Sequence, residues 1–278
     1  MCNNLLQYAH VYAWGREHGR KVISMRFSYK YQYFRICHTS LTGFGWYLFA
    51  KYMSAVGLLP TASFKRGDCD REALERKMLR CRHIVVSGWN VRFYDLFLKY
   101  RSEICDLFTL DEQYTRPVKA RMQQAEESSP ITHHPSPITH HPSPIRLGVH
   151  IRRGDYAQWQ DGIYCYEDEV YADHINKFAS LHEGTAVHVY LSTNDASVTA
   201  EDYRERCPRV CIHLLGGSAP EDLFMLSECD YLIGPPSTFS LVAAMYRDIL
   251  LYRMDNSDAG RLTLDGFKRF DYWFRRIV

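Results

Sequence analysis

The stretch "LGVHIRRGDY", residues 147–156, decides the fold of the second half of the chain. A short apolar run leads into a histidine, two adjacent arginines and Gly-Asp-Tyr. Side chains alternate along an extended strand, so Val149 and Ile151 share one face and His150 and Arg152 share the other. The stretch therefore predicts a strand that carries two guanidinium groups to its polar end.

The sequence after this strand alternates regularly. Apolar runs occupy 147–151, 187–191, 210–215, 231–233 and 249–252, and helix-like patterns occupy 167–181, 221–229 and 238–246. Such alternation predicts an α/β fold, a parallel sheet with helices on its faces. Ligands bind beyond the carboxyl ends of the strands in these sheets, so "RRGDY", "STND" and "GPPSTFS" are expected at one edge.

The first half of the chain has weaker patterns. A helix is expected at the N-terminus, ending near Gly19, followed by short strands at 22–25 and 84–86. The second of these runs into "SGWNVRFYDLFLKY", where apolar residues recur at helical spacing. Residues 26–70 are rich in Tyr and Phe without a clear period, and no element is predicted there.

A heptapeptide repeat, "SPITHHP", lies between the two halves at 129–145. Its prolines exclude a coiled coil and favour an extended linker. We therefore predict an N-terminal domain at 1–125, a linker at 126–145 and a C-terminal domain at 146–278. The histidines of the repeat leave a metal site as the alternative for this segment; they are His133, His134, His140 and His141.

The composition limits the partners. The chain has 278 residues, 46% hydrophobic, and 34 Lys and Arg against 32 Asp and Glu, a net charge of +2 that does not suggest nucleic acid. Nine cysteines without Cys-x-x-Cys spacing suggest free thiols in a reducing compartment. No apolar run approaches the roughly 20 residues of a transmembrane helix, and no signal peptide is recognisable. We predict a cytoplasmic protein and leave open a peripheral contact with the inner face of a membrane.

The paired arginines favour an anionic ligand. Guanidinium groups bind phosphate oxygens with two hydrogen bonds, so Arg152 and Arg153 fit a diphosphate. A surface ion pair with Asp155 is the alternative. An integrin-binding Arg-Gly-Asp is disfavoured by the apolar strand that precedes it.

Two further segments carry polar residues suited to a ligand. Ser237 and Thr238 open a helix, where free N–H groups bind phosphate, although an ordinary helix cap explains them equally. Asp222 lies in the first turn of another helix, where a carboxylate complements the helix dipole. The motif Asp68-Cys69-Asp70 matches a metal-binding Asp-x-Asp, but no buried strand precedes it.

Together these motifs resemble the α-1,2-fucosyltransferases of glycosyltransferase family 11, within the α-1,2/α-1,6 fucosyltransferase group. The resemblance runs through "HIRRGDY", "VYLSTND" and "EDLFMLSECDYLIGPPSTFS", in the family's order. The opening "NNLLQYAHVYAWGREHG" and the segment "SGWNVRFY" are similar to the family's N-terminal motifs. The resemblance therefore covers most of the chain outside the linker and residues 26–70.

The resemblance implies a GT-B architecture of two Rossmann-like halves. It implies transfer of fucose from GDP-fucose to a galactose hydroxyl of a glycan in α-1,2 linkage, with inversion and without a metal or other cofactor. Arg152 and Arg153 would neutralise the leaving GDP, and Asp155 is the candidate general base. The remaining donor-site roles fall to His150 and Asp222 at guanine, Ser237 and Thr238 at phosphate, and Asp195 in the donor pocket.

The N-terminal half departs from the family's pattern. Family members begin with a strand and a Gly-rich turn, whereas Met1 here lies almost on the first helix, so the half is predicted to be truncated at its first strand. Three alternatives to the α-1,2 activity follow: transfer at another linkage, transfer of another GDP-sugar, and an inactive GDP-sugar- or glycan-binding protein.

Overall fold

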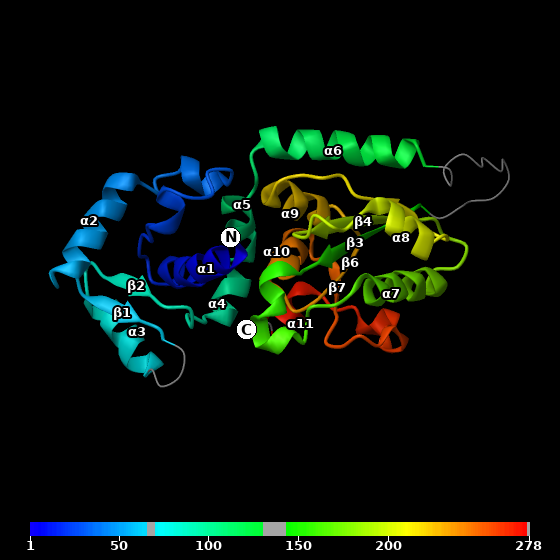
Figure 1. The fold of residues 1–278 in the computed structure, drawn as a ribbon. Helices are drawn as coiled ribbons and strands as arrows, with labels where there is room; N and C mark the ends of the chain where they lie inside the picture. Colours follow the sequence, from blue (N-terminus) through cyan, green and yellow to red (C-terminus); the bar gives the residue numbers. More distant parts are fainter. Residues whose placement is uncertain (66–69, 130–142, 277–278) are drawn as a thin grey trace. The chain divides into compact units, whose positions relative to one another are not determined.

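A computed structural model describes residues 1–65, 70–129 and 143–276 of the chain (Figure 1). The chain divides into two compact units, Met1–Asp111 and Glu112–Val278. The fold is α/β, and each unit contains a parallel sheet. This agrees with the predicted fold class.

The C-terminal unit is built on a five-stranded parallel sheet in the order β5-β4-β3-β6-β7. The strands are β3 (Ile145–Ile151), β4 (Val187–Thr193), β5 (Cys211–His213), β6 (Tyr231–Gly234) and β7 (Leu250–Arg253). The helices are α6 (Glu112–Glu127), α7 (Asp168–Leu181), α8 (Ala200–Arg206), α9 (Ala219–Ser227), α10 (Thr238–Arg247) and α11 (Phe270–Phe274). All five predicted strands and all three predicted helices of this half are confirmed.

The strand order creates a switch point beside β3. The chain adds β4 and β5 on one side of β3 and then returns to add β6 and β7 on the other side. The loops after β3 and β6 therefore diverge at the carboxyl edge of the sheet. A crevice for a ligand forms at such a point in open parallel sheets.

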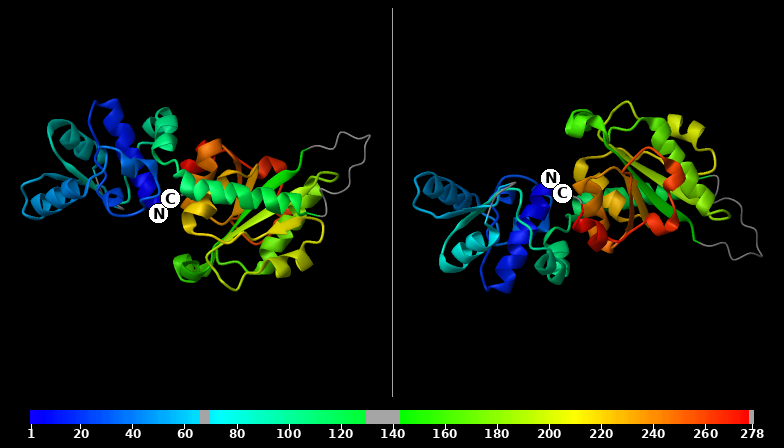
Figure 2. Two further views of the ribbon diagram at one scale, coloured as in Figure 1. Left: turned by 90° about the horizontal axis from the view of Figure 1, so that it is seen from above. Right: turned by 90° about the horizontal axis from the view of Figure 1, so that it is seen from below.

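The two faces of the sheet differ in chemistry. Leu147, Val149 and Ile151 of β3 pack into one apolar core with α7, which contributes Ile175 and Phe178. On the opposite face, α6 and α9 lie across the sheet, as the views of Figures 1 and 2 show. The alternation predicted from the first strand is therefore the alternation between these two faces.

Gly148 shows how closely α9 approaches this second face. A Cβ atom at Gly148 would lie 2.8 Å from Leu226 Cδ2 of α9 and 2.5 Å from Leu232 Cδ2 of β6. Real Cβ atoms do not approach other carbons so closely. A glycine at this position of β3 therefore lets the helix pack directly on the strand.

Helix α6 is held on the sheet by a polar cluster. Glu126 accepts two hydrogen bonds from Arg146, from Nε at 2.7 Å and from Nη2 at 3.0 Å, and one from the Tyr190 hydroxyl at 2.6 Å. Arg121 of the same helix pairs with Glu221 of α9 at 2.6 Å.

The prediction placed residues up to 125 in the N-terminal domain, whereas the structural units divide after Asp111. Residues 130–142 of the predicted linker, with all four of its histidines, lie outside the described residues.

The N-terminal unit contains a small parallel sheet, β1 (Thr61–Ser63) with β2 (Val85–Ser87). Its helices are α1 (Cys2–Glu17), α2 (Phe44–Ala55), α3 (Arg71–Arg80), α4 (Tyr94–Lys99) and α5 (Arg101–Leu107). The predicted first helix and the predicted strand at 84–86 are confirmed. The strand predicted at 22–25 is wrong, because the described backbone there makes a single bridge, Ser24 with Thr42.

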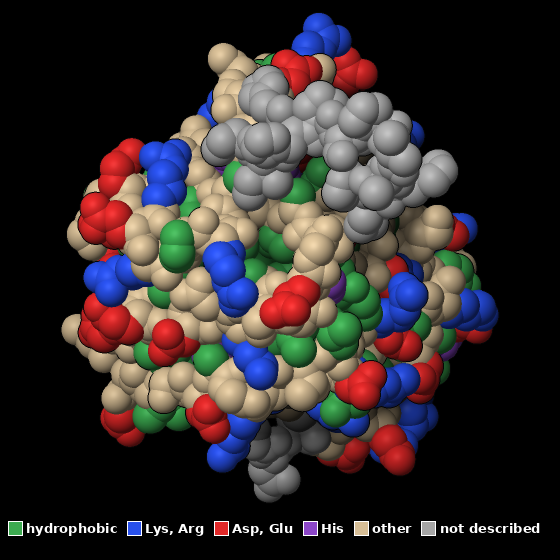
Figure 3. Space-filling model, turned by 90° about the vertical axis from the view of Figure 1, so that its right-hand side faces the viewer, with side chains coloured by type: hydrophobic (Ala, Val, Ile, Leu, Met, Phe, Trp, Pro, Cys, Tyr) green, Lys and Arg blue, Asp and Glu red, His purple; other side chains and the backbone are tan. Residues whose placement is uncertain are grey.

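Three general features bear on the partners of the protein. No helix among the described residues is long and apolar enough to cross a membrane. The eight cysteines that the structure describes are free thiols. Figure 3 shows basic and acidic side chains interspersed over one face of the molecule, in line with the balanced net charge.

The Glu126 cluster predicts how the C-terminal unit responds to acid. Burial disfavours the Glu126 carboxylate, but the hydrogen bonds from Arg146 and Tyr190 outweigh it and hold the pKa below its ordinary value of 4.5. Glu126→Gln should lower the free energy of unfolding by about 2 kcal/mol at neutral pH, since hydrogen bonds to charged groups contribute about that much. The depressed pKa means that this stability is present above pH 4.5 and is lost as the pH falls through the lower, folded-state pKa.

Melting temperatures measured from pH 7 to pH 3 check this prediction. The difference between the wild type and Glu126→Gln should be largest at pH 7 and shrink below pH 4.5. Glu127→Gln is the matched control, because Glu127 is exposed and its bond among the described residues is to Gln123 of the same helix. A difference that stays constant over the whole pH range would contradict the role of the Glu126 charge.

Candidate functional site at the carboxyl edge of the sheet

The three predicted loops meet at one edge of the C-terminal sheet. The neighbouring strands β4, β3 and β6 run parallel, with Val149 aligned to Leu191 on one side and to Ile233 on the other. "RRGDY" follows β3, "STND" begins within the last residues of β4, and "GPPSTFS" follows β6. The structure thus brings together the segments that the strand pattern placed at one edge.

Arg153 is enclosed by acceptors from three segments. Its Nη2 donates to Asp168 Oδ1 at 2.6 Å, its Nη1 to Asp195 Oδ2 at 3.2 Å, and its Nε to the Tyr166 carbonyl at 3.1 Å. The Arg153 side chain is only 13% exposed. All three guanidinium nitrogens therefore have protein partners, and Arg153 joins the loop after β3 to α7 and to the loop after β4.

The backbone of Arg153 is held as well. Asn194 accepts from the Arg153 N–H at 2.9 Å and donates from its amide nitrogen to the Arg153 carbonyl at 3.0 Å. Gly154 follows with φ of +64°, a conformation that favours glycine. The Asn194 amide thus fixes the point at which the chain turns out of β3.

Arg152 is arranged differently from its neighbour. Its Nη2 lies 2.9 Å from both carboxylate oxygens of Asp155, and its guanidinium lies 5.6 Å from the centre of the Tyr156 ring. The Arg152 side chain is 31% exposed and that of Asp155 is 62% exposed. An ion pair this open to solvent contributes little stability and is easily exchanged for another anion. Arg152 is therefore the more accessible cation of the pair.

Asp222 is a half-buried carboxyl group on the α9 side of the sheet. It accepts a hydrogen bond from the Ser192 hydroxyl, at the end of β4, with an Oγ–Oδ2 distance of 2.8 Å. Burial raises the pKa of Asp222 to about 6, above its ordinary value of 3.8. A carboxyl group with a pKa near neutrality changes charge easily when a hydrogen-bonding ligand reaches it.

His150 is buried beneath the start of α10. Its Nδ1 lies 2.8 Å from the Ser240 hydroxyl, and its ring packs against Phe239 with the ring centres 5.0 Å apart. Burial, helped by the nearby charge of Arg152, lowers the pKa of His150 to about 3. The imidazole is neutral at physiological pH and supports the first turn of α10.

The N-terminus of α10 faces the same edge of the sheet. Ser237 is the N-cap and accepts from the Phe239 N–H at 3.1 Å, and Thr238 is the first residue of the helix. Tyr156 donates its hydroxyl proton to the Pro236 carbonyl at 2.5 Å and so joins the loop after β3 to the loop before α10. The structure therefore assembles Arg152, Thr238 and their supports at the switch point.

The prediction missed several residues that build this edge. Asn194 and Ser192 lie within the "VYLSTND" motif but were not singled out, since their bonding partners are distant in sequence. Asp168 opens α7, where a first-turn carboxylate has an ordinary explanation in the helix dipole. Only the tertiary structure brings Asp168 to Arg153.

The alternative metal motifs lie largely outside the described residues. Asp68 and Cys69 lie outside the described residues, and Asp70 caps α3 by accepting from the Ala73 N–H at 2.9 Å. Among the described residues no group of three or more His, Cys, Asp or Glu side chains could hold a metal ion.

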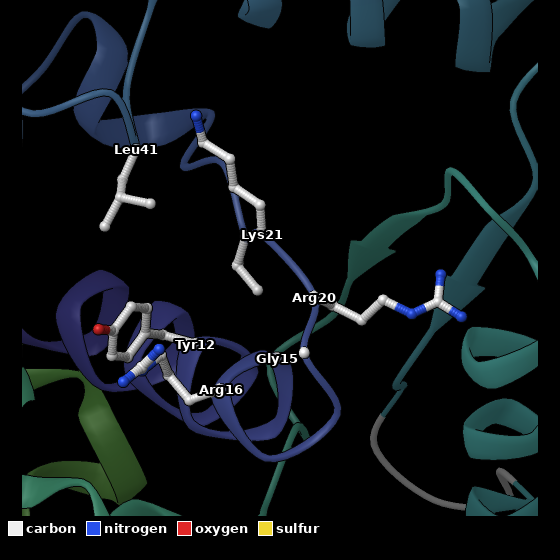
Figure 4. A pocket seen from close by; sticks show the side chains of 8 residues that line it. Tyr12, Gly15, Arg16, Arg20, Lys21 and Leu41 are labelled. Atoms are coloured by element: carbon white, nitrogen blue, oxygen red, sulfur yellow. The ribbon is translucent and has the colours of Figure 1, made fainter.

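A separate hollow of about 370 Å³ lies in the N-terminal unit (Figure 4). It contains none of the predicted site residues, although three cations line it. Arg16 pairs with Glu103, Arg20 donates to the carbonyls of Leu79 and Cys81, and Lys21 reaches the Ser40 hydroxyl at 3.3 Å. Two of the three cations are therefore committed to holding the unit together, and we assign this hollow no reaction.

Comparison with known proteins extends the structural result. No family model and no curated protein matches the sequence significantly. Among solved structures, a mutant of Arabidopsis thaliana FUT1 in complex with GDP matches over 97% of this chain and 71% of that chain, with 13% identity and a TM-score of 0.61. The chain has a GT-B fold. POFUT1 in complex with GDP-fucose matches over 87% of this chain and 90% of that chain, with 10% identity and a TM-score of 0.53.

The different surroundings of the two arginines predict different effects on stability. Arg153→Ala should lower the free energy of unfolding by about 3 kcal/mol, because it leaves two partly buried carboxylates without their cation. Arg153→Lys should restore little, since an ammonium cannot reach three acceptors in the planar arrangement.

Calorimetric melting of the purified variants checks this prediction. Arg152→Ala is the matched control on the neighbouring residue and should cost less than about 1 kcal/mol, as is usual for exposed ion pairs. Equal losses for both alanine variants would contradict the structural role assigned to Arg153.

Proposed function

We propose that this protein is a glycosyltransferase that transfers fucose from GDP-fucose to a galactose hydroxyl of a glycan. One observation carries the proposal: an accessible arginine and a helix N-terminus follow the two strands that flank the switch point of a GT-B fold, and a carboxyl group of raised pKa bonds to the end of the next strand, β4. The structures with this fold include complexes with GDP and with GDP-fucose, which supports the choice of donor. The α-1,2 linkage and the galactose acceptor rest on the motif resemblance.

In this proposal Arg152 binds the diphosphate. Fucose leaves with GDP, so negative charge develops on the diphosphate in the transition state, and a fixed guanidinium beside it lowers the barrier. The N–H groups at the start of α10 and the Thr238 hydroxyl add further donors on the same side. The sequence prediction assigned Arg153 to the diphosphate too, but its three protein partners favour a positioning role for it.

Asp155 is proposed as the general base. The diphosphate and Asp155 compete for Arg152, so donor binding would release the Asp155 carboxylate from its ion pair. An inverting displacement needs a group that takes the proton of the acceptor hydroxyl as the new bond forms. Donor binding and activation of the base would then be coupled through one arginine.

Asp222 is proposed to read the guanine base. An ionised carboxylate accepts hydrogen bonds from the guanine N1–H and from the exocyclic amine, whereas adenine presents no such pair of donors. Ser192 holds the carboxyl group in place, and His150 supports α10 from below. No metal is required in this scheme, since the arginine and the helix supply the positive charge.

Turnover of GDP-fucose tests the proposed function. Labelled donor is offered with a panel of galactose-terminated acceptors, in excess EDTA and with donor hydrolysis measured in parallel. Arg152→Ala should lower kcat/KM for GDP-fucose about a hundredfold, which corresponds to about 3 kcal/mol of transition-state stabilisation. Arg152→Lys should not restore the rate, because an ammonium lacks the planar two-point contact.

Arg204→Ala is the matched control, since Arg204 is an exposed arginine of α8 paired with Glu201. GDP binding without transfer or hydrolysis would favour an inactive binding protein. Activity lost in EDTA and restored by a divalent metal would refute the metal-free mechanism. A well-folded Arg152→Ala variant with wild-type kinetics would refute the diphosphate assignment.

The raised pKa of Asp222 predicts how GDP binding depends on pH. The ionised carboxylate is the form that accepts from guanine, so GDP affinity should rise as the pH increases through about 6, where burial places the pKa of Asp222. Asp222→Asn should bind GDP about tenfold more weakly at pH 7.5, in keeping with the strength of a hydrogen bond to a charged group.

Calorimetric titration with GDP and with ADP at pH 5 and pH 7.5 provides the measurement. The wild type should prefer GDP more strongly at the higher pH, and Asp222→Asn should lose this pH dependence. An unchanged pH profile in the variant would remove Asp222 from the guanine site.

A further inference from the structure

Helix α2 of the N-terminal unit exposes an unusual number of large apolar side chains. None of its residues is buried. Trp46, Phe49 and Tyr52 are 57%, 49% and 59% exposed, and their spacing of three residues sets them along one side of the helix. A helix of a folded unit ordinarily turns such a stripe towards the core. Here the stripe faces outward.

A second group of aromatic rings lies where a neighbouring turn meets the helix. The 3₁₀ turn η1 (Arg26–Ser28) contacts α2, and the ring of Tyr29, just after it, lies 4.8 Å from the ring of Tyr47. We call the resulting surface the aromatic face; its members are Tyr29, Phe44, Trp46, Phe49, Tyr52 and Val56, all exposed. Large apolar side chains exposed together on one element usually mark a binding site.

The segment that carries the aromatic face is strongly basic. Residues 1–60 contain seven Lys or Arg and one acidic residue, Glu17, a net charge of +6, whereas the whole chain carries only +2. The positive charge is therefore concentrated in the first fifth of the chain. The remaining residues carry a net negative charge.

The basic residues nearest the aromatic face are exposed. Arg26, Lys30 and Lys51 have no ion pair among the described residues. Arg26 Nη1 donates to the Tyr29 hydroxyl at 3.2 Å, and Lys51 Nζ lies 5.8 Å and 5.9 Å from the centres of the Tyr47 and Tyr52 rings. These contacts place cations directly beside the aromatic rings.

We propose that the aromatic face binds an anionic lipid bilayer, with α2 lying in the plane of the membrane surface. Trp and Tyr rings are favoured at the boundary between headgroups and acyl chains, and apolar side chains on one side of an in-plane helix enter it. Arg26, Lys30 and Lys51 meet the anionic headgroups, whose attraction for basic residues falls off within a Debye length. Aromatic burial and charge attraction act together at this surface.

The charge argues against a second copy of the chain as the occupant. Two copies joined through this surface would bring like charges together, which opposes association. The proposal does not depend on the chemistry of the C-terminal unit. A failure of vesicle binding would leave the proposed transfer reaction untouched.

Vesicle co-sedimentation of the full chain tests the proposal. The probes are phosphatidylcholine vesicles and vesicles with about one-third phosphatidylglycerol, at low and high salt. The wild type should bind the anionic vesicles, bind neutral ones at least about tenfold more weakly, and lose affinity as salt rises. The double variant Trp46→Ala, Phe49→Ala should lower the partition coefficient about tenfold or more, as should Lys30→Glu, Lys51→Glu.

Leu264→Ala and Tyr272→Ala are the matched controls, because both residues are exposed but lie in the C-terminal unit. They should bind like the wild type, and melting temperatures should show that every variant is folded. The Trp46 fluorescence of the wild type, taken as the difference from Trp46→Ala, should shift to the blue on binding. Equal binding to both kinds of vesicle would overturn the proposal. So would a salt-insensitive dimer formed without vesicle binding, and so would wild-type binding by the two double variants.

Discussion

The guanidinium of Arg153 is the interaction on which the candidate site depends. It draws the loop after β3, the loop after β4 and the start of α7 to one point through Asp168, Asp195 and the Tyr166 carbonyl. Removing a guanidinium from solvent is costly unless each of its donors finds an acceptor, and here they do. These bonds fix the backbone at the end of β3. The preceding residue, Arg152, is therefore held in a defined direction. Arg153 therefore has a structural role, and its neighbour Arg152 stays accessible.

The cost of burying polar groups also explains the states of the groups around Arg152. His150 cannot carry a charge in its apolar surroundings, so it serves as a neutral support for α10 through Ser240. Asp222 is less deeply enclosed and keeps a carboxyl group that can ionise near neutral pH. The difference in burial thus gives the histidine a structural role and leaves the carboxyl group suited to a ligand. Both residues lie on the face of the sheet that α6, α9 and α10 cover.

The two units differ in where their charge and apolar surface lie. The C-terminal unit buries an apolar core between its sheet and α7, and it closes the other face of the sheet with α6 through Glu126. The N-terminal unit buries one cluster around Phe64 and Trp14 and another set of rings that includes Phe27, Phe34 and Phe108, and it leaves α2 without any buried residue. The first unit of the chain thus presents a basic, aromatic surface, and the second presents a polar edge suited to a nucleotide. These are separate surfaces with separate chemistry.

The C-terminal sheet could be predicted from the sequence alone. A strand that is buried on both faces has a continuous run of apolar residues, and a helix has apolar residues at a period of 3.6. The strands from Ile145 to Arg253 could therefore be predicted from short segments of sequence. The edge carrying Arg152 and Thr238 followed from the same pattern. In the N-terminal unit the sequence predicted the first helix and the strand at 84–86 correctly, but residues 26–70 showed no clear pattern. The strand β1 is only three residues long, too short to show a period, and α2 buries no residue, so its sequence carries no apolar stripe that faces a core.

The division of roles between the arginines was decided only by the tertiary structure. Arg152 and Arg153 are adjacent and chemically identical in the sequence, and both were assigned to the same anion. Their difference comes from Asp168 and Asp195, which are 15 and 42 positions away from Arg153 and reach it only when α7 and β4 pack beside β3. The same holds for α6, whose place on the sheet depends on Arg146 and Tyr190 meeting Glu126. A partner's distance along the chain carries no information about its distance in space, so these assignments required the fold.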